Sequence, residues 1–130
     1  MNYQVERSEQ EWKEQLGEER YRILRRKGTE PPFSGKYNMH FEEGVYRCGG
    51  CGEPLFDSSS KFNSSCGWPS FDESLPGKID YVRDTSFGML RTEILCSTCG
   101  GHLGHVFDDG PTDTGQRYCV NSLSIDFEES

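Results

Sequence analysis

Six cysteines are the residues of this chain best suited to chemistry, and four of them form two CxxC pairs. The pairs are Cys48 with Cys51 and Cys96 with Cys99, and glycines crowd both turns. A two-residue spacer lets a tight turn aim both sulfurs at one point, and Zn2+ takes four thiolates at about 2.3 Å. We therefore expect one structural zinc ion, with no open position for catalysis. The alternative, a thioredoxin-like redox motif, needs a βαβ context that the sequence does not show.

The cellular compartment decides which chemistry the cysteines perform. The first residues, MNYQVERSEQ, lack the apolar centre of a signal peptide, and no run approaches the roughly 18 apolar residues of a membrane span. We expect a cytoplasmic protein with no membrane partner, whose cysteines bind metal or perform redox chemistry. A disulfide framework stays open as an alternative, because a signal peptide could have been removed.

Cys119 is one of two cysteines outside the CxxC pairs. If its segment forms a strand, period two places Arg117, Cys119 and Asn121 on one face, with Tyr118 and Val120 toward the core. A guanidinium beside the thiol would favour the thiolate, and the amide could orient it. These neighbours suit a nucleophile, although a small buried hydrophobe is the commoner fate of a free cysteine.

Cys66 lies where a flexible polar stretch, residues 63–65, meets the rigid aromatic stretch at residues 67–71. Mobility of this kind would suit a resolving thiol. The alternative is an exposed cysteine without a role, because exposure and flexibility alone prove no chemistry.

His102 and His105 are candidates for acid–base chemistry, since the four CxxC cysteines already complete a metal shell. A regular strand would place these two histidines on opposite faces. Both can serve one site only if the backbone turns around Gly104. A histidine that is hydrogen-bonded at a turn is the alternative for either.

Short N-terminal helices are expected ahead of these residues. A capping box of Ser8 and Glu11 predicts a helix start, and Gly17 interrupts the helix. A second helix is expected over residues 18–27, with basic residues in its last turn and Gly28 as its end.

The rest of the chain predicts a mainly β fold. The prolines of residues 29–35 exclude a helix and indicate a linker lying on the body. From Val45 onward, short apolar runs alternate with Gly, Asn, Asp and Ser, which is typical of an all-β domain. Strands are expected near residues 45–48, 54–57, 79–83, 89–95, 103–107 and 117–127.

The 130 residues suffice for one domain, taken as 1–130 with a helical segment at 1–28 and a β body at 29–130. The hydrophobic share of 32% and the 15 glycines predict a modest core, which metal binding would supplement. The net charge of -8 argues against nucleic acid as a partner, because phosphate binding needs clustered Lys and Arg.

Several motifs in a fixed order resemble those of methionine-R-sulfoxide reductases. Besides the two CxxC pairs, they are GTEPPF at 28–33, CGWPSF at 66–71, GHLGHVFDDGP at 101–111 and RYCVNS at 117–122. The resemblance implies two antiparallel β-sheets forming a small barrel-like body, with N-terminal helices and a zinc site. It also implies thiol-dependent reduction of methionine-R-sulfoxide, protein-bound or free, to methionine.

The resemblance also implies roles for both free thiols. The cysteine of the RYC motif attacks the sulfoxide sulfur in this family, which implies that Cys119 is the nucleophile. Its sulfenic acid would condense with Cys66, which matches the family's resolving position. Residues 63–65 differ from the acidic and glycine residues more usual there, so the resolving step depends on how this segment moves.

Substrate contacts follow from the same resemblance. Trp68 would help form the apolar box for the S-methyl group. His105 and Asn121 would bind and polarise the substrate, and His105 could protonate the sulfoxide oxygen. His102 and Arg117 would support them.

The resemblance implies thioredoxin as the reductant, with a potential of about -270 mV, and oxidised proteins as substrates. We expect a monomer. Two rivals stay open: a non-enzymatic zinc module that binds a protein partner, and a thiol peroxidase. Trp68 argues against the peroxidase, because peroxide needs no apolar methyl box.

Overall fold

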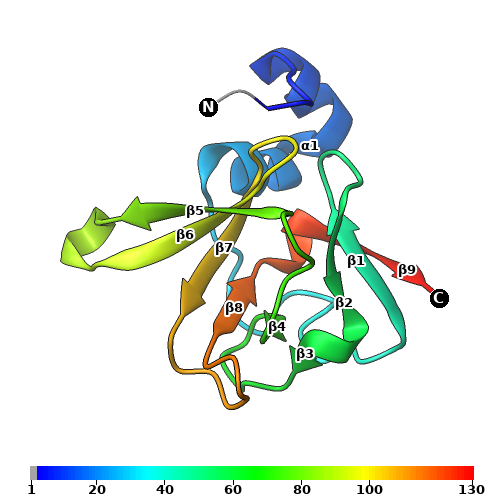
Figure 1. Cartoon of the computed structure of the whole chain (residues 1–130). Coiled ribbons are helices and arrows are strands. Elements are labelled where there is room, and N and C mark those ends of the chain that lie inside the picture. Colours follow the sequence, from blue (N-terminus) through cyan, green and yellow to red (C-terminus); the bar gives the residue numbers. More distant parts are fainter. Residues whose placement is uncertain (1–2) are drawn as a thin grey trace.

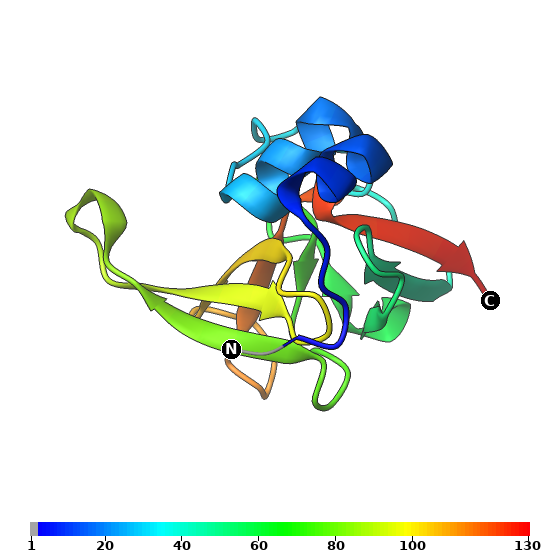
Figure 2. The same cartoon turned by 90° about the horizontal axis from the view of Figure 1, so that it is seen from above.

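The structure, a computed structural model, describes residues 3–130 apart from the side chain of Phe87. A helix lies against two antiparallel sheets (Figure 1), and one sheet extends into a long hairpin of β5 and β6 (Figure 2). The elements in chain order are α1 (Glu9–Arg26), β1 (Gly44–Cys48), β2 (Pro54–Asp57), β3 (Lys61–Phe62), β4 (Ser70–Phe71), β5 (Ile79–Asp84), β6 (Arg91–Cys96), β7 (His102–Phe107), β8 (Arg117–Val120) and β9 (Ile125–Glu129).

Helix α1 begins at the predicted capping box. Ser8 accepts a hydrogen bond from the Glu11 N–H, and the Glu11 carboxylate accepts one from the Ser8 N–H. Gly17 has a φ of 81° and breaks the helical geometry, so the two predicted helices form one kinked element. The predicted end is wrong by one residue. Lys27 takes the left-handed conformation, because the N–H of Gly28 returns to a carbonyl of the last turn.

The buried face of α1 carries Trp12, Ile23 and Leu24, and the helix packs against β7 and the 3₁₀ turn at Ser122–Ser124. Within the described residues, no helix is long and apolar enough to cross a membrane.

The sheets have the strand orders β2-β1-β9 and β3-β4-β8-β7-β6-β5, and every pairing is antiparallel. The mainly β class is therefore confirmed. Sequence reasoning missed β3 and β4, because two-residue strands show no periodicity. The barrel-like shape is not confirmed, since strand pairing leaves both sheets open within residues 3–130.

The long strand predicted over residues 117–127 is wrong. A 3₁₀ turn at Ser122–Ser124 divides it, so that β8 and β9 belong to different sheets. The Ser124 hydroxyl donates to the His102 carbonyl oxygen at 2.9 Å, which holds the turn against β7. The chain thus changes sheet directly after Asn121.

Aromatic side chains dominate the core between the sheets. The rings of Phe56 and Phe71 stack at 4.2 Å, and Tyr46 and Tyr118 pack edge-on against them. Full burial of one such ring contributes about 1.5–3 kcal/mol. This packing supports β8, which carries Cys119, and its neighbour β4.

Candidate metal centre and active site

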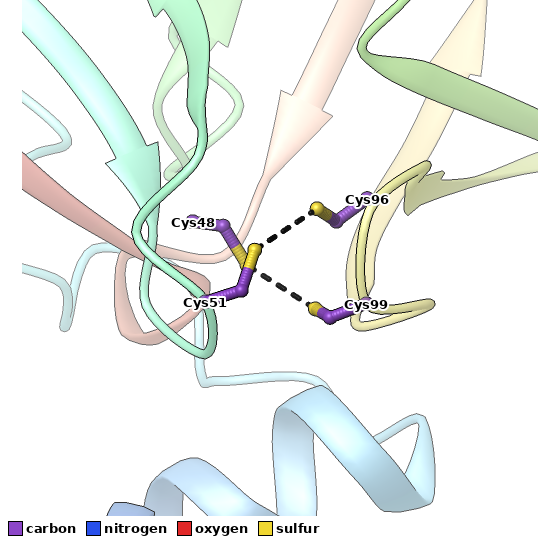
Figure 3. Close-up of side chains that lie close together, drawn as sticks. All are labelled: Cys48, Cys51, Cys96 and Cys99. Carbon is purple, nitrogen blue, oxygen red and sulfur yellow. Dashed lines mark hydrogen bonds between the residues drawn. The ribbon is translucent and has the colours of Figure 1, made fainter. Parts of the chain in front are cut away.

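The four CxxC sulfurs converge between the ends of β1 and β6 (Figure 3). The Sγ atoms of Cys48 and Cys99 lie 3.6 Å apart, as do those of Cys51 and Cys96, and all four lie within 4.8 Å of one another. Thiolates about 2.3 Å from a tetrahedral ion would lie roughly 3.8 Å apart. The donor set and its spacing therefore fit a metal ion.

Helix α1 covers this cluster. Gly50 lies so close to Trp12 that a Cβ at this position would approach the indole ring within 3.3 Å. The guanidinium of Arg25 donates to the Cys99 carbonyl oxygen at 2.8 Å. Positive φ angles occur at Gly52 and Gly100, one in each turn. A bound metal would therefore stabilise both turns and the helix packed on them.

A cavity of about 250 Å³ lies along β7 and β8. Its size suits one side chain or a small molecule. It brings together all seven residues that sequence reasoning assigned to substrate chemistry: Cys66, Trp68, His102, His105, Arg117, Cys119 and Asn121. The lining is completed by Thr29, Arg91, Gly104, Phe107 and Val120.

Cys66 and Cys119 are in contact within this cavity, with their Sγ atoms 3.6 Å apart. The contact arises because β4 pairs with β8, which places Ser70 opposite Cys119. The hydroxyl of Ser64 also donates to the Cys66 sulfur at 2.9 Å. Strand β8 alternates as predicted, with Tyr118 and Val120 buried and Cys119 turned toward the cavity.

The contact shifts the two thiols in opposite directions. The hydrogen bond from Cys119 is the main reason that the pKa of Cys66 falls to about 4, and Ser64 and Ser70 add to it. The same contact raises the pKa of Cys119, burial raises it further, and Arg117 only partly opposes this. The contact and its surroundings therefore favour the thiolate form at Cys66 over Cys119. Arg117 acts on Cys119 in the expected direction, but the Cys66 contact and burial outweigh its effect.

A β-bulge places both histidines at the cavity. Ile94 pairs with Gly104 and Leu95 pairs with His102, so Leu103 is an extra residue in β7. The extra residue shifts the alternation, and the rings of His102 and His105 lie 5.8 Å apart. Both histidines could serve one site only if the backbone turned near Gly104, and this bulge meets that condition.

Gly104 is required where β7 meets β8. A Cβ at this position would lie 2.0 Å from the Cys119 carbonyl oxygen. The close approach leaves His105 directly opposite Cys119 in the strand pairing.

Each histidine contacts a carboxylate that sequence reasoning missed. His105 Nε2 lies 2.8 Å from Asp84 Oδ2, and His102 Nδ1 lies 2.6 Å from the buried Glu93. Burial lowers the pKa of His105, while Asp84 opposes this effect. Glu93 could have been found from the sequence, because it lies inside the apolar run of β6 and a buried carboxylate needs a partner. Asp84 could be identified as the partner of His105 only from the strand pairing in the structure.

Arg117 is held by another missed carboxylate. Its guanidinium donates to both carboxylate oxygens of Asp109, at 2.8 and 3.0 Å, and stacks over the ring of Phe107. A bidentate pair of this kind restricts the guanidinium to one orientation. Arg117 therefore forms a rigid wall of the cavity.

Trp68 and Asn121 are both held by a residue of the expected linker. The Trp68 indole N–H donates to the Glu30 carbonyl oxygen, and the Glu30 N–H donates to Asn121 Oδ1, each at 3.0 Å. The Asn121 amide also donates to the Leu103 carbonyl oxygen at 3.1 Å. Residues 29–35 are thus part of the site rather than a plain connection.

Comparison with known proteins identifies the family. The SelR domain profile matches residues 16–129. The peptide methionine sulfoxide reductase MsrB of Leptospira interrogans is 53% identical over 130 residues, which cover 99% of each chain. The protein of that name from Hahella chejuensis is 58% identical over 127 residues, or 97% of this chain and 91% of that protein. The chain therefore belongs to the SelR domain family of MsrB proteins, which confirms the resemblance of its motifs.

Proposed function

We propose that this protein is an oxidoreductase that reduces methionine-R-sulfoxide to methionine, with Cys119 as the nucleophile. One observation carries the proposal: Cys119 lines a small cavity with Trp68 and His105, and a second thiol lies 3.6 Å away. The activity named for its relatives supports it. A non-enzymatic zinc module would give these cavity residues no role.

In the first step, the Cys119 sulfur attacks the sulfoxide sulfur and takes over its oxygen. Cys119 is oxidised to a sulfenic acid, and the substrate is reduced to methionine. Cys119 gives its proton to the Cys66 thiolate. The ring nitrogen of His105 that faces away from Asp84 supplies a proton to the sulfoxide oxygen. Asp84 supports this role, because a carboxylate at 2.8 Å stabilises the imidazolium against the effect of burial.

In the second step, the Cys66 thiol condenses with the sulfenic acid to form a disulfide and release water. The two sulfurs need only approach from 3.6 Å to about 2.05 Å. An external dithiol, which we propose to be thioredoxin, then reduces the disulfide and is itself oxidised.

Substrate binding uses the remaining walls of the cavity. Trp68 provides the apolar surface for the S-methyl group. Asn121 keeps one amide hydrogen for the sulfoxide oxygen, because the other is donated to Leu103. His102 and Arg117 are proposed as supporting residues, each oriented by its carboxylate.

We further propose that Cys48, Cys51, Cys96 and Cys99 hold one structural Zn2+. Four sulfurs at this spacing support zinc, which accepts a closed shell of thiolates. When bound, the ion would contribute folding free energy and no chemistry.

The remaining proposals concern the protein as a whole. We infer that residues 1–130 act as one monomeric domain in the cytoplasm, with oxidised proteins as substrates. In the proposed segments 1–28 and 29–130, helix α1 and the β body share one core, in which Trp12 and Leu24 of α1 pack with the strands. A reducing compartment would keep the catalytic thiols available.

The test offers separated R and S forms of methionine sulfoxide, with dithiothreitol as reductant, to the wild type and to Cys119→Ser. We expect turnover of the R form alone and a loss of at least about 1000-fold in the variant, because a hydroxyl replaces the nucleophile. Hydrogen peroxide offered in place of the sulfoxide should be a poor substrate. Preference for the S form, or undiminished turnover by the variant, would overturn the proposal.

A further inference from the structure

Glu30 is a buried acidic residue that the proposed reaction does not use. Only 1% of its surface is exposed. One carboxylate oxygen accepts a hydrogen bond from the Leu123 N–H at 2.9 Å, and the other, Oε2, has no hydrogen-bond partner among residues 3–130. Burying a carboxylate with an unpaired oxygen costs free energy. Its position therefore needs an explanation.

The backbone of Glu30 links two residues that line the cavity. Its carbonyl oxygen accepts from the Trp68 indole, and its N–H donates to the Asn121 side chain. Trp68 precedes β4 and Asn121 follows β8. One residue thus contacts both the apolar wall and the amide that faces the sulfoxide oxygen in the proposed function.

The side chain of Glu30 determines where this backbone lies. The Leu123 N–H that it binds belongs to the 3₁₀ turn directly after Asn121. Gly35 leaves space for the carboxylate, because a Cβ there would lie 2.3 Å from Glu30 Oε2. The two prolines that follow Glu30 limit the conformations the segment can take. Without the carboxylate, residue 30 would lose its side-chain hydrogen bond to the 3₁₀ turn.

We propose that Glu30 is a positioning residue whose carboxylate sets the placement of Trp68 and Asn121 in the substrate cavity. The inference rests on the proposed function for its kinetic consequence, although the placement itself can be measured without activity. Removal of the carboxylate lets the segment move away from the 3₁₀ turn, which loosens the Trp68 indole and misaligns the substrate.

The experiment measures hydrogen exchange of the two indole N–H groups by NMR in 15N-labelled protein. Trp12, which lies on the buried face of α1 and is 2% exposed, serves as the internal reference. In Glu30→Ala, exchange at Trp68 should accelerate at least about tenfold while Trp12 keeps its rate, and kcat/KM for the sulfoxide should fall by about tenfold or more. Glu30→Gln, which keeps an acceptor oxygen at the same length, should restore both quantities most of the way. Glu19→Ala, an exposed glutamate beside the same segment, is the matched control and should change neither.

If Glu30→Ala does not fold, the same exchange rates are measured in Glu30→Asp, which withdraws the carboxylate by one methylene and keeps the charge. Trp68 exchange should accelerate in this variant as well. Unchanged Trp68 exchange in a folded variant would overturn the proposal. Equal acceleration at Trp12 and Trp68 would also overturn it, since that result indicates a general loss of stability. If the wild type does not reduce the sulfoxide, the proposed function fails, and the indole exchange still decides whether Glu30 positions Trp68.

Discussion

The molecule contains two sulfur sites with the same spacing and different surroundings. In each, neighbouring Sγ atoms lie 3.6 Å apart. The CxxC cluster has four sulfurs beneath α1, three of them in buried cysteines. The pair of Cys66 and Cys119 has two sulfurs that line an open cavity, and the Cys66 sulfur accepts a serine hydroxyl. Spacing alone therefore does not separate a metal site from a redox site. The number of thiols and their access to substrate do.

The two sites also form by different routes. Each CxxC pair comes from one local turn, so half of the cluster is built into a few consecutive residues. Cys66 and Cys119 meet only because β4 pairs with β8. The cluster should thus govern stability, and the pair should govern turnover.

The largest expected effect is on stability, in the cluster. Cys96→Ser should lower Tm by more than about 10 °C, because the site loses a thiolate ligand and the fold loses its metal. Calorimetry with metal analysis checks this, and one zinc per chain is expected in the wild type. Cys66→Ser is the matched control and should move Tm by less than about 3 °C. A Cys96→Ser protein without metal and with an unchanged Tm would contradict the assignment.

The next effect separates the two thiols of the pair. Cys66→Ser should keep turnover driven by dithiothreitol. Loss of the Cys66 contact removes the main cause of the raised pKa of Cys119, so Cys119 still attacks without a proton acceptor at residue 66, and a small dithiol reduces its sulfenic acid directly. Turnover driven by thioredoxin should fall by about 100-fold or more, because no intramolecular disulfide forms for it to reduce. Steady-state assays with each reductant measure the difference. Full activity with both reductants would remove Cys66 from the mechanism.

The smallest effect concerns the charge of the pair. The pKa of Cys66 is lowered to about 4, so this thiol should react with iodoacetamide as a thiolate at pH 6. Its main cause is the hydrogen bond from Cys119, so Cys119→Ala should move that pKa upward toward the usual value of about 8.5. Mass spectrometry of zinc-loaded protein should then show alkylation at pH 6 slowed by about tenfold or more. If alkylation of Cys66 depends on pH in the same way in the wild type and in Cys119→Ala, the low pKa of Cys66 has another cause.

The chemistry that depends on short segments was predictable from sequence. The four metal-binding candidates follow from CxxC spacing, and the outward face of Cys119 follows from period two in β8. The break at Gly17 is likewise local, because a glycine can leave helical geometry at little cost.

Features that depend on strand pairing were not predictable. The extra residue Leu103 brings His102 and His105 to one face, and no local pattern reveals which strand carries a bulge. The change of sheet after Asn121 was missed for a similar reason. Its 3₁₀ turn is held by contacts with β7 and with the distant Glu30.

The sequence by itself therefore determined the family, the mainly β class and the candidate side chains for the cavity and the cysteine cluster, because these depend on residue identity and short-range geometry. The tertiary structure alone decided that contact with Cys119 lowers the pKa of Cys66, that Asp84 and Glu93 face the histidines, and that Glu30 lies buried between Trp68 and Asn121. Protonation and burial depend on which groups meet in space and on how much water is excluded from them. Distant segments set both quantities only once they pack together.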